Sequence, residues 1–262
     1  MRPASARAAI HVLTTTIVAA GLLTAAPAHA SDLPVFSCRV NGADAPPSRM
    51  VQGTSGPDRI ECENDVRNVV IWGAGGNDYI RVKGMVVNAQ VLGGDGDDSI
   101  QVNNLVPATG DSMVRGDDGN DTIITALVYG SAEHGAEVRG DMGDDTITTG
   151  SVMGQPGEFQ RGGGQVFGND GQDRITTGTV DLGGRVLGGS EDDVIEPKAV
   201  GVESAGIIMG GPGRDKIRGR EDTQLVIGPG YGQVDGGPAA DECKVRHSST
   251  GERIRSTLSG CP

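Results

Sequence analysis

The chain has 262 residues, a formal net charge of −13 and 44 glycines, but only 3% of its residues are aromatic. A chain this acidic is a poor partner for nucleic acid or anionic membranes and a natural partner for cations. Each glycine costs conformational entropy to order. An ordinary compact core of large side chains is therefore not expected.

Residues 1–30 have the pattern of a secretory signal peptide. Arg2 and Arg7 form a basic start, an Ala-rich apolar run follows, and Ala28-His29-Ala30 is an A-x-A cleavage site. An uncleaved membrane anchor is the alternative interpretation of the same segment. No later segment is apolar for long enough to cross a bilayer. We expect cleavage near Ala30 and a secreted, extracellular protein.

Nine glycine- and aspartate-rich segments repeat along the rest of the chain, and the fullest is GGDGDDSI, from Gly93 to Ile100. The eighth residue of each copy is Ile, except for Cys243 in the ninth, and Val or Ile lies two residues before each first glycine. The sixth residue is always Asp: Asp58, Asp78, Asp98, Asp121, Asp145, Asp173, Asp193, Asp215 and Asp241.

β-Branched residues two positions before the turn and two positions after the Asp indicate a strand, a tight glycine corner and a second strand. A unit this short cannot bury its apolar face alone, so successive units must stack. The sequence therefore predicts an all-β fold, a parallel β-roll or β-helix solenoid of about nine coils. Asp-Gly hairpins are the alternative, but hairpins do not explain the column of Asp residues.

Stacking places Asp over Asp at the strand spacing of about 4.8 Å, where carboxylates repel one another unless cations lie between the coils. Ca²⁺ suits such a position, because it binds 6–8 oxygens and accepts carboxylates together with backbone carbonyls. Mg²⁺ is less suitable, since it demands near-octahedral geometry and keeps its waters. All nine sixth-position aspartates are therefore candidate Ca²⁺ ligands.

The pattern G-G-x-G-x-D-x-(apolar)-x resembles the RTX, or hemolysin-type, calcium-binding nonapeptide, and residues 93–101 match it at every defined position. The resemblance covers residues 53 to about 244. It implies a parallel β-roll with Ca²⁺ held between adjacent turns by backbone carbonyls and the sixth-position Asp. One motif per coil implies ions on one edge only. Glu191 and Ala239 replace the fourth glycine in two copies, which weakens the expectation for those two sites.

Four cysteines in an exported chain predict two disulfides. Nine coils have eight intervals, which at about 4.8 Å each place the ends about 38 Å apart, whereas a disulfide needs Cα atoms within about 7 Å. The expected pairs are therefore local, Cys38–Cys62 and Cys243–Cys261, and they pin the two ends. The expected organisation is a signal peptide at 1–30, an N-terminal cap at 31–52, calcium-binding repeats at 53–245 and a C-terminal cap at 246–262.

Little in the sequence indicates catalysis. His134 and His247 lie far apart, and no nucleophile elbow, zinc helix or phosphate-binding loop occurs. We expect a calcium-binding protein that is not an enzyme. The alternatives are a calcium-dependent module that binds an extracellular polysaccharide or cell surface, and a β-helix polysaccharide lyase. The aromatic residues do not recur at one repeat position, which disfavours a sugar-binding platform. An ice-binding face is a further alternative, but only two ITTG runs, at 147–150 and 175–178, indicate it.

Overall fold

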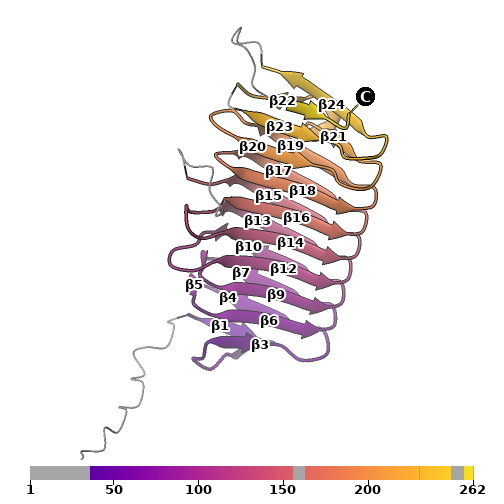
Figure 1. Ribbon diagram of the computed structural model, residues 1–262. Coiled ribbons are helices and arrows are strands. Elements are labelled where there is room, and N and C mark those ends of the chain that lie inside the picture. The colour runs from indigo at the N-terminus through magenta and orange to yellow at the C-terminus, as the bar shows by residue number, and fades with distance from the viewer. Residues whose placement is uncertain (1–35, 156–162, 230, 249–256, 262) are drawn as a thin grey trace, which may run out of the picture. The chain divides into compact units, whose positions relative to one another are not determined.

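Each repeat folds as one strand, a glycine corner and a second strand, and the coils stack in parallel (Figure 1). The computed structural model describes residues 36–155, 163–229, 231–248 and 257–261. Equivalent strands of successive coils pair with each other, so the two strands that flank a corner belong to different sheets. This confirms the parallel solenoid and excludes hairpins at the glycine corners. The expected signal peptide lies outside the described residues.

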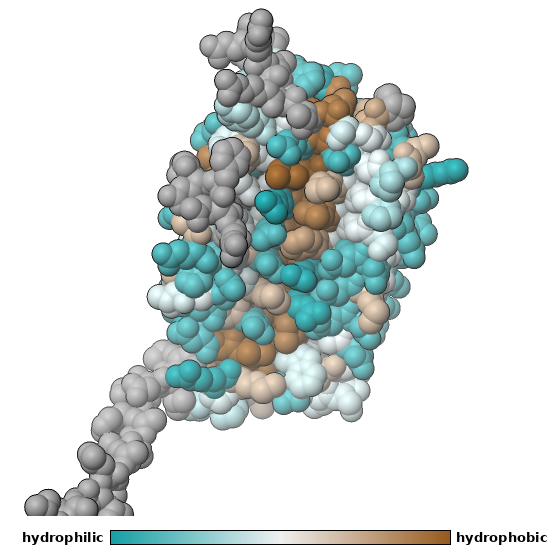
Figure 2. Space-filling model, viewed as in Figure 1, coloured by the Kyte–Doolittle hydropathy of each residue, from teal (hydrophilic) through white to brown (hydrophobic). Residues whose placement is uncertain are grey.

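Ten parallel strands form the sheet that precedes the corners. In spatial order they are β3 (Met50–Gln52), β6 (Val70–Gly75), β9 (Gln90–Asp95), β12 (Ser112–Asp118), β14 (Ala136–Met142), β16 (Gly164–Asp170), β18 (Gly184–Ser190), β20 (Gly206–Met209), β23 (Gly232–Asp235) and β25 (Thr257–Ser259). Hydrophobic residues gather in separate patches on the face of the solenoid drawn in Figure 2.

The sheet that follows the corners has fifteen strands. Its main path contains β2 (Ala43–Asp44), β1 (Cys38–Val40), β4 (Arg59–Cys62), β7 (Tyr79–Val82), β10 (Ser99–Val102), β13 (Thr122–Tyr129), β15 (Thr146–Met153), β17 (Arg174–Asp181), β19 (Val194–Val200), β21 (Lys216–Arg218), β24 (Glu242–His247) and β22 (Leu225–Ile227). The short strands β5 (Val66–Arg67), β8 (Val86–Val87) and β11 (Asn104–Leu105) lie beside this path. A 3-10 turn, η2 (Arg220–Asp222), follows β21. Among the residues that the structure describes, no helix is long and apolar enough to cross a membrane.

The two hydrophobic columns predicted from the sequence are in register and buried. Val91 pairs with Val114, and Ile100 pairs with Ile123, so each side chain packs on its equivalent in the next coil. A third buried column, which the repeat pattern did not reveal, lies on the far side of each coil. It contains Val66, Val86, Leu105, Val128, Val152, Val180, Val200 and Ile227. Three columns enclose one continuous core along the solenoid axis.

Both predicted disulfides are present at the ends of the stack. Cys38 and Cys62 are direct neighbours in the antiparallel pairing of β1 with β4, and their Cα atoms are 4.0 Å apart. Cys243 in β24 bonds Cys261 just after β25, with Cα atoms 5.6 Å apart, and so joins the last strands of the two sheets.

Two adjacent isoleucines of β13 provide a matched test of the core. Ile123 is fully buried, whereas Ile124 is 39% exposed. We expect Ile123→Ala to lower the free energy of unfolding by about 2–5 kcal/mol, because it leaves a cavity between packed coils. Ile124→Ala should change it by no more than about 0.5 kcal/mol. Urea denaturation of both variants, with calcium present, measures the difference; equal losses would contradict the stacked core.

Candidate metal centre

The nine sixth-position aspartates form one buried column beside the glycine corners. Each is only 1–4% exposed, although carboxylates are rarely buried without a partner. Each lies directly before the first strand residue of the fifteen-stranded sheet, so the regular pairing of that sheet places successive carboxylates one coil apart. The predicted column is therefore present, and all nine members face the interior.

One oxygen of each carboxylate hydrogen-bonds to the preceding coil. The backbone N–H of Asp58 donates to Oδ1 of Asp78, and the same bond recurs through eight steps to Asp241, with N···O distances of 2.7–2.9 Å. The backbone carbonyls of the first eight aspartates in turn accept an N–H from the following coil, as when Tyr79 donates to Asp58. The column is thus a ladder that ties each coil to the next.

The other carboxylate oxygen, Oδ2, is buried and has no hydrogen-bond partner among the described residues in eight of the nine aspartates. These are Asp78, Asp98, Asp121, Asp145, Asp173, Asp193, Asp215 and Asp241. A buried oxygen without a partner costs about 1–3 kcal/mol, and more when it is charged. Eight such atoms in one row require a common explanation.

Asp58, at the N-terminal end of the column, differs from the other eight. The side-chain amide of Asn41 donates to its Oδ1, and the backbone N–H and hydroxyl of Thr54 donate to its Oδ2. Burial by itself would raise the pKa of Asp58, but these three hydrogen bonds outweigh it and lower the pKa. The N-terminal carboxylate is therefore already satisfied by this chain's own donors.

The first glycine of each copy is required by the close approach of oxygen atoms. A methyl group on Gly116 would overlap Oδ2 of Asp121 in the same corner and the carbonyl oxygen of Gly140 in the next coil. The same two kinds of oxygen surround the corresponding glycine of every copy. Each corner thus presents an unpartnered carboxylate oxygen beside a carbonyl oxygen from the neighbouring coil, except that the Asp58 carboxylate is capped.

Except in the first corner, the second corner position has a left-handed backbone, and so does the fourth position of the second to eighth corners. Asp117 and Asp141 adopt it at the second position, with φ of 78° and 82°, and Arg115 pairs with both side chains. Glu191 keeps a φ of 76° at the fourth position, so the seventh corner retains its shape without glycine there. Ala239 is not among the residues with positive φ, and the ninth corner differs in this respect.

Side chains at the fifth corner position form a second ladder of hydrogen bonds. Here each side chain accepts an N–H from the following coil, whereas the sixth-position Asp accepts one from the preceding coil. Oδ1 of Asn77 accepts the N–H of Asp97 in the next coil, and Oδ1 of Asp97 accepts the N–H of Asn120. Asn120, Asp144 and Asp192 continue the pattern at 2.8 Å. In GGDGDDSI, therefore, the side chain of Asp97 accepts from the following coil, and the side chain of Asp98 accepts from the preceding coil.

Burial in the column shifts the acid–base equilibrium of the aspartates. Desolvation is the largest cause, and the negative charge of neighbouring acids adds to it, while the hydrogen bond from the preceding coil opposes it. The pKa of Asp78 is raised. The pKa is raised to about 7 for Asp98, about 6 for Asp121, about 8 for Asp145, about 6 for Asp173, about 8 for Asp193 and about 6 for Asp215.

These features fit a hard cation bound by oxygen. In the described part of the chain no three His, Cys, Asp or Glu side chains gather into a metal cluster, so carboxylates alone would not complete a coordination shell. Carbonyl oxygens beside each unpartnered Oδ2 can supply the remaining ligands. Mixed carboxylate and carbonyl oxygen is the donor set that Ca²⁺ accepts. The residues present therefore fit Ca²⁺.

Two contributors to the column were missed from the sequence. Gly260, just after β25, places its carbonyl beside Gly236 and Asp241 as the next coil would do. Leu258 lies two residues before Gly260, and that spacing was a usable signal. Asn41 was not detectable, because it comes from an antiparallel hairpin outside the repeat.

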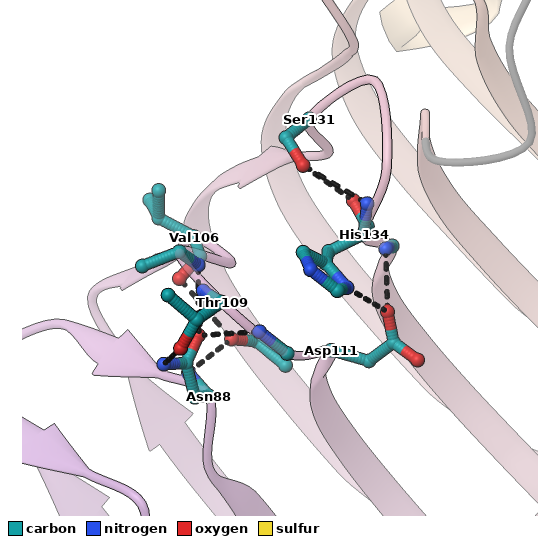
Figure 3. A network of polar contacts seen from close by, with 10 residues as sticks. Asn88, Val106, Thr109, Asp111, Ser131 and His134 are labelled. Carbon is teal, nitrogen blue, oxygen red and sulfur yellow. Dashed lines mark hydrogen bonds and ion pairs between the residues drawn. The ribbon is translucent and has the colours of Figure 1, made fainter.

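The opposite edge, where each coil returns to the next, contains a different polar network (Figure 3). The ring of His134 lies 3.7 Å from a carboxylate oxygen of Asp111, but the Ser131 hydroxyl donates to the backbone carbonyl of His134 and not to its ring. Asn88 accepts three backbone N–H groups from residues 108–110. This network shapes the return loops and does not align a serine with a histidine base.

The crowding at the first glycine gives a testable prediction. Gly116→Ala should displace the Asp121 carboxylate and lower the free energy of unfolding by about 1–3 kcal/mol, as in other overpacked interiors. Gly110→Ala is the matched control, because the nearest atom to a methyl group there is Asn88 Cβ at 3.9 Å. Thermal melting of both variants measures the effect. A stability loss confined to Gly116→Ala is expected, and two unaffected variants would refute the crowding.

The geometry is supported by one comparison with known families. The family model for the RTX calcium-binding nonapeptide repeat (4 copies) matches residues 67–82 and 108–126. These segments contain the second and fourth corners, with Asp78 and Asp121. No curated protein and no solved structure matches the chain. The chain thus carries RTX calcium-binding nonapeptide repeats.

Proposed function

We propose that this protein is a secreted calcium-binding β-roll, which folds when Ca²⁺ binds between its stacked corners. The observation that carries the proposal is the row of eight buried Asp Oδ2 atoms without hydrogen-bond partners among the described residues. Each lies beside a glycine carbonyl of the neighbouring coil. Asp78, Asp98, Asp121, Asp145, Asp173, Asp193, Asp215 and Asp241 would supply carboxylate ligands, while Asp58 is capped by Asn41 and Thr54.

Bound calcium would supply positive charge to this acidic edge. The chain's own residues provide the rest: Oδ1 of each Asp fixes the distance between coils, and the glycine carbonyls line the interval. Without cations, ionised carboxylates repel across about 4.8 Å and the column of Val and Ile must also offset the entropy of ordering many glycines. Folding and calcium binding would then be one coupled process.

An extracellular setting agrees with this proposal. Two disulfides near the ends of the stack are typical of oxidising compartments. Extracellular modules bind Ca²⁺ with dissociation constants of about 10⁻⁴–10⁻³ M, so calcium outside the cell would order the chain and scarce calcium inside would not. Export through the expected signal peptide would therefore deliver the protein to the place where it folds.

Circular dichroism tests the coupling directly. Titration of the chelated protein with millimolar Ca²⁺ should produce a cooperative increase in β signal and raise the melting temperature, whereas Mg²⁺ should act much more weakly. The reference sample is the same protein in excess EGTA. A β spectrum and melting temperature that EGTA leaves unchanged would refute calcium-dependent folding.

Protons should compete with calcium for the column. The raised folded-state pKa values, about 6 to 8, lie above the usual value of about 3.9 for an unfolded chain. Without calcium, their contribution to stability is full below about pH 4 and is lost as the pH rises through 6 to 8. Saturating calcium should offset that loss, because it stabilises the ionised form. Melting curves from pH 4 to 8, recorded once in EGTA and once in saturating calcium, measure how stability changes with pH in each condition. A stability in EGTA that rises from pH 4 to 8 would contradict the buried column.

Calcium uptake near pH 6.5 should therefore release protons, and Asp121→Asn should reduce both the bound calcium and the protons released. Asparagine keeps an oxygen that can accept the N–H of Asp98, so the ladder can persist. The control is Glu203→Gln, an exposed acid in a return loop. Calorimetry in buffers of different ionisation enthalpy measures stoichiometry and proton release together. Equal values for the two variants would exclude Asp121 as a ligand.

A further inference from the structure

A groove of about 530 Å³ crosses the second, third and fourth coils on the fifteen-stranded sheet. The register of β7, β10 and β13 places Arg81 beside Gln101 and Gln101 beside Ile124 along one wall. The second wall follows two residues later along each coil and contains Lys83, Asn103 and Ala126. The groove therefore runs across the strands, parallel to the solenoid axis.

The polar groups of the groove are oriented by neighbouring residues. The Tyr79 hydroxyl donates to Oε1 of Gln101, which leaves the Gln101 NH₂ group to donate. The Asn103 NH₂ group donates to the Lys83 carbonyl, which leaves Oδ1 of Asn103 to accept. The groove thus presents an amide donor on one wall and an amide acceptor on the other.

Arg81 is the cation available to a ligand. It is exposed and makes no hydrogen bond or close ion pair among the described residues, but it lies beside Glu61 in the register of β4 with β7, and, after the hydrogen bond from Arg59, its charge helps to lower the pKa of Glu61. The acids at the N-terminal end of the groove are already paired, Glu61 with Arg59 and Glu63 with Lys83. Three cations, Arg59, Arg81 and Lys83, thus surround two acids, Glu61 and Glu63. The excess positive charge makes a local site for an anion, and the planar fork of Arg81 suits a carboxylate.

Apolar contact is available next to this cation. Ile124 is 39% exposed on the same wall, and Ala126 is exposed opposite it. A pyranose ring has hydroxyl groups on its edge and C–H groups on its faces. An amide donor, an amide acceptor, one guanidinium and an aliphatic surface together match a sugar that bears a carboxylate.

We propose that this groove binds an extended, uronate-containing polysaccharide, with one sugar carboxylate on Arg81, hydroxyls on Gln101 and Asn103, and a ring face on Ile124. Because the groove runs across the strands, equivalent side chains recur along it at the spacing between strands. Consecutive sugars of the chain would therefore meet consecutive coils. An acidic peptide is the less favoured ligand, because the sheet here has no free edge for its backbone: β7 and β13 pair on both sides of β10. The site lies on a sheet face and uses none of the corner aspartates.

Isothermal titration with an oligogalacturonate tests the proposal. Free calcium is buffered at a saturating millimolar level, since the probe itself binds calcium, and circular dichroism establishes that each variant is folded. The methyl-esterified oligomer and a poly-glutamate of similar charge are the comparison ligands. We expect binding of the oligogalacturonate that weakens with salt, and binding of the ester and of poly-glutamate that is about tenfold or more weaker.

Arg81→Gln should weaken oligogalacturonate binding about tenfold, and Ile124→Ala should weaken it without loss of stability. The matched control is Arg185→Gln, which removes the same charge from an exposed position on the other sheet and should change binding less than about twofold. A folded, calcium-saturated protein that does not bind would overturn the groove while leaving the calcium proposal intact. Equal binding of the ester or of poly-glutamate, or equal losses in Arg81→Gln and Arg185→Gln, would also overturn it.

Discussion

The hydrogen bond from one buried aspartate N–H to the next aspartate carboxylate determines the rest of the structure. The bond, with an N···O distance of 2.7–2.9 Å, fixes the register of neighbouring coils. It also holds each carboxylate in the interior, away from water. Because one oxygen is committed to this bond, the second oxygen is left to face the glycine carbonyls. In each of these side chains, therefore, Oδ1 aligns the coils and Oδ2 is the oxygen available to a cation.

Glycine has two separate physical roles in the same corner. The first glycine makes room for two oxygen atoms, and a methyl group there would overlap both of them. The second and fourth positions of most corners have a left-handed backbone, which Asp117, Asp141 and Glu191 also adopt. This explains why the first position is glycine in all nine copies, whereas the others vary.

The fold and the aspartate column could be predicted because three positions repeat at a fixed distance from the corner. Ile100, Asp98 and Val91 each have an equivalent in the neighbouring coils, and register follows from that repetition. The third hydrophobic column was not predictable in the same way, since return loops of unequal length separate Leu105 from the corner that follows it. The groove was also hidden, because Arg81, Gln101 and Ile124 share a position but no chemical type.

The ladder also has a direction, and this makes the two ends of the array chemically unequal. Each sixth-position carboxylate from Asp78 onward accepts from the coil before it, so a stack shortened from its C-terminal side would expose the backbone N–H and the backbone carbonyl of an Asp, which water can satisfy. A stack shortened from its N-terminal side would expose a carboxylate that has lost its donor. In the intact chain Asn41 of the N-terminal hairpin supplies that donor to Oδ1 of Asp58, while Thr54 of the same corner donates to Oδ2. The hairpin therefore ends a ladder that could otherwise accept another coil.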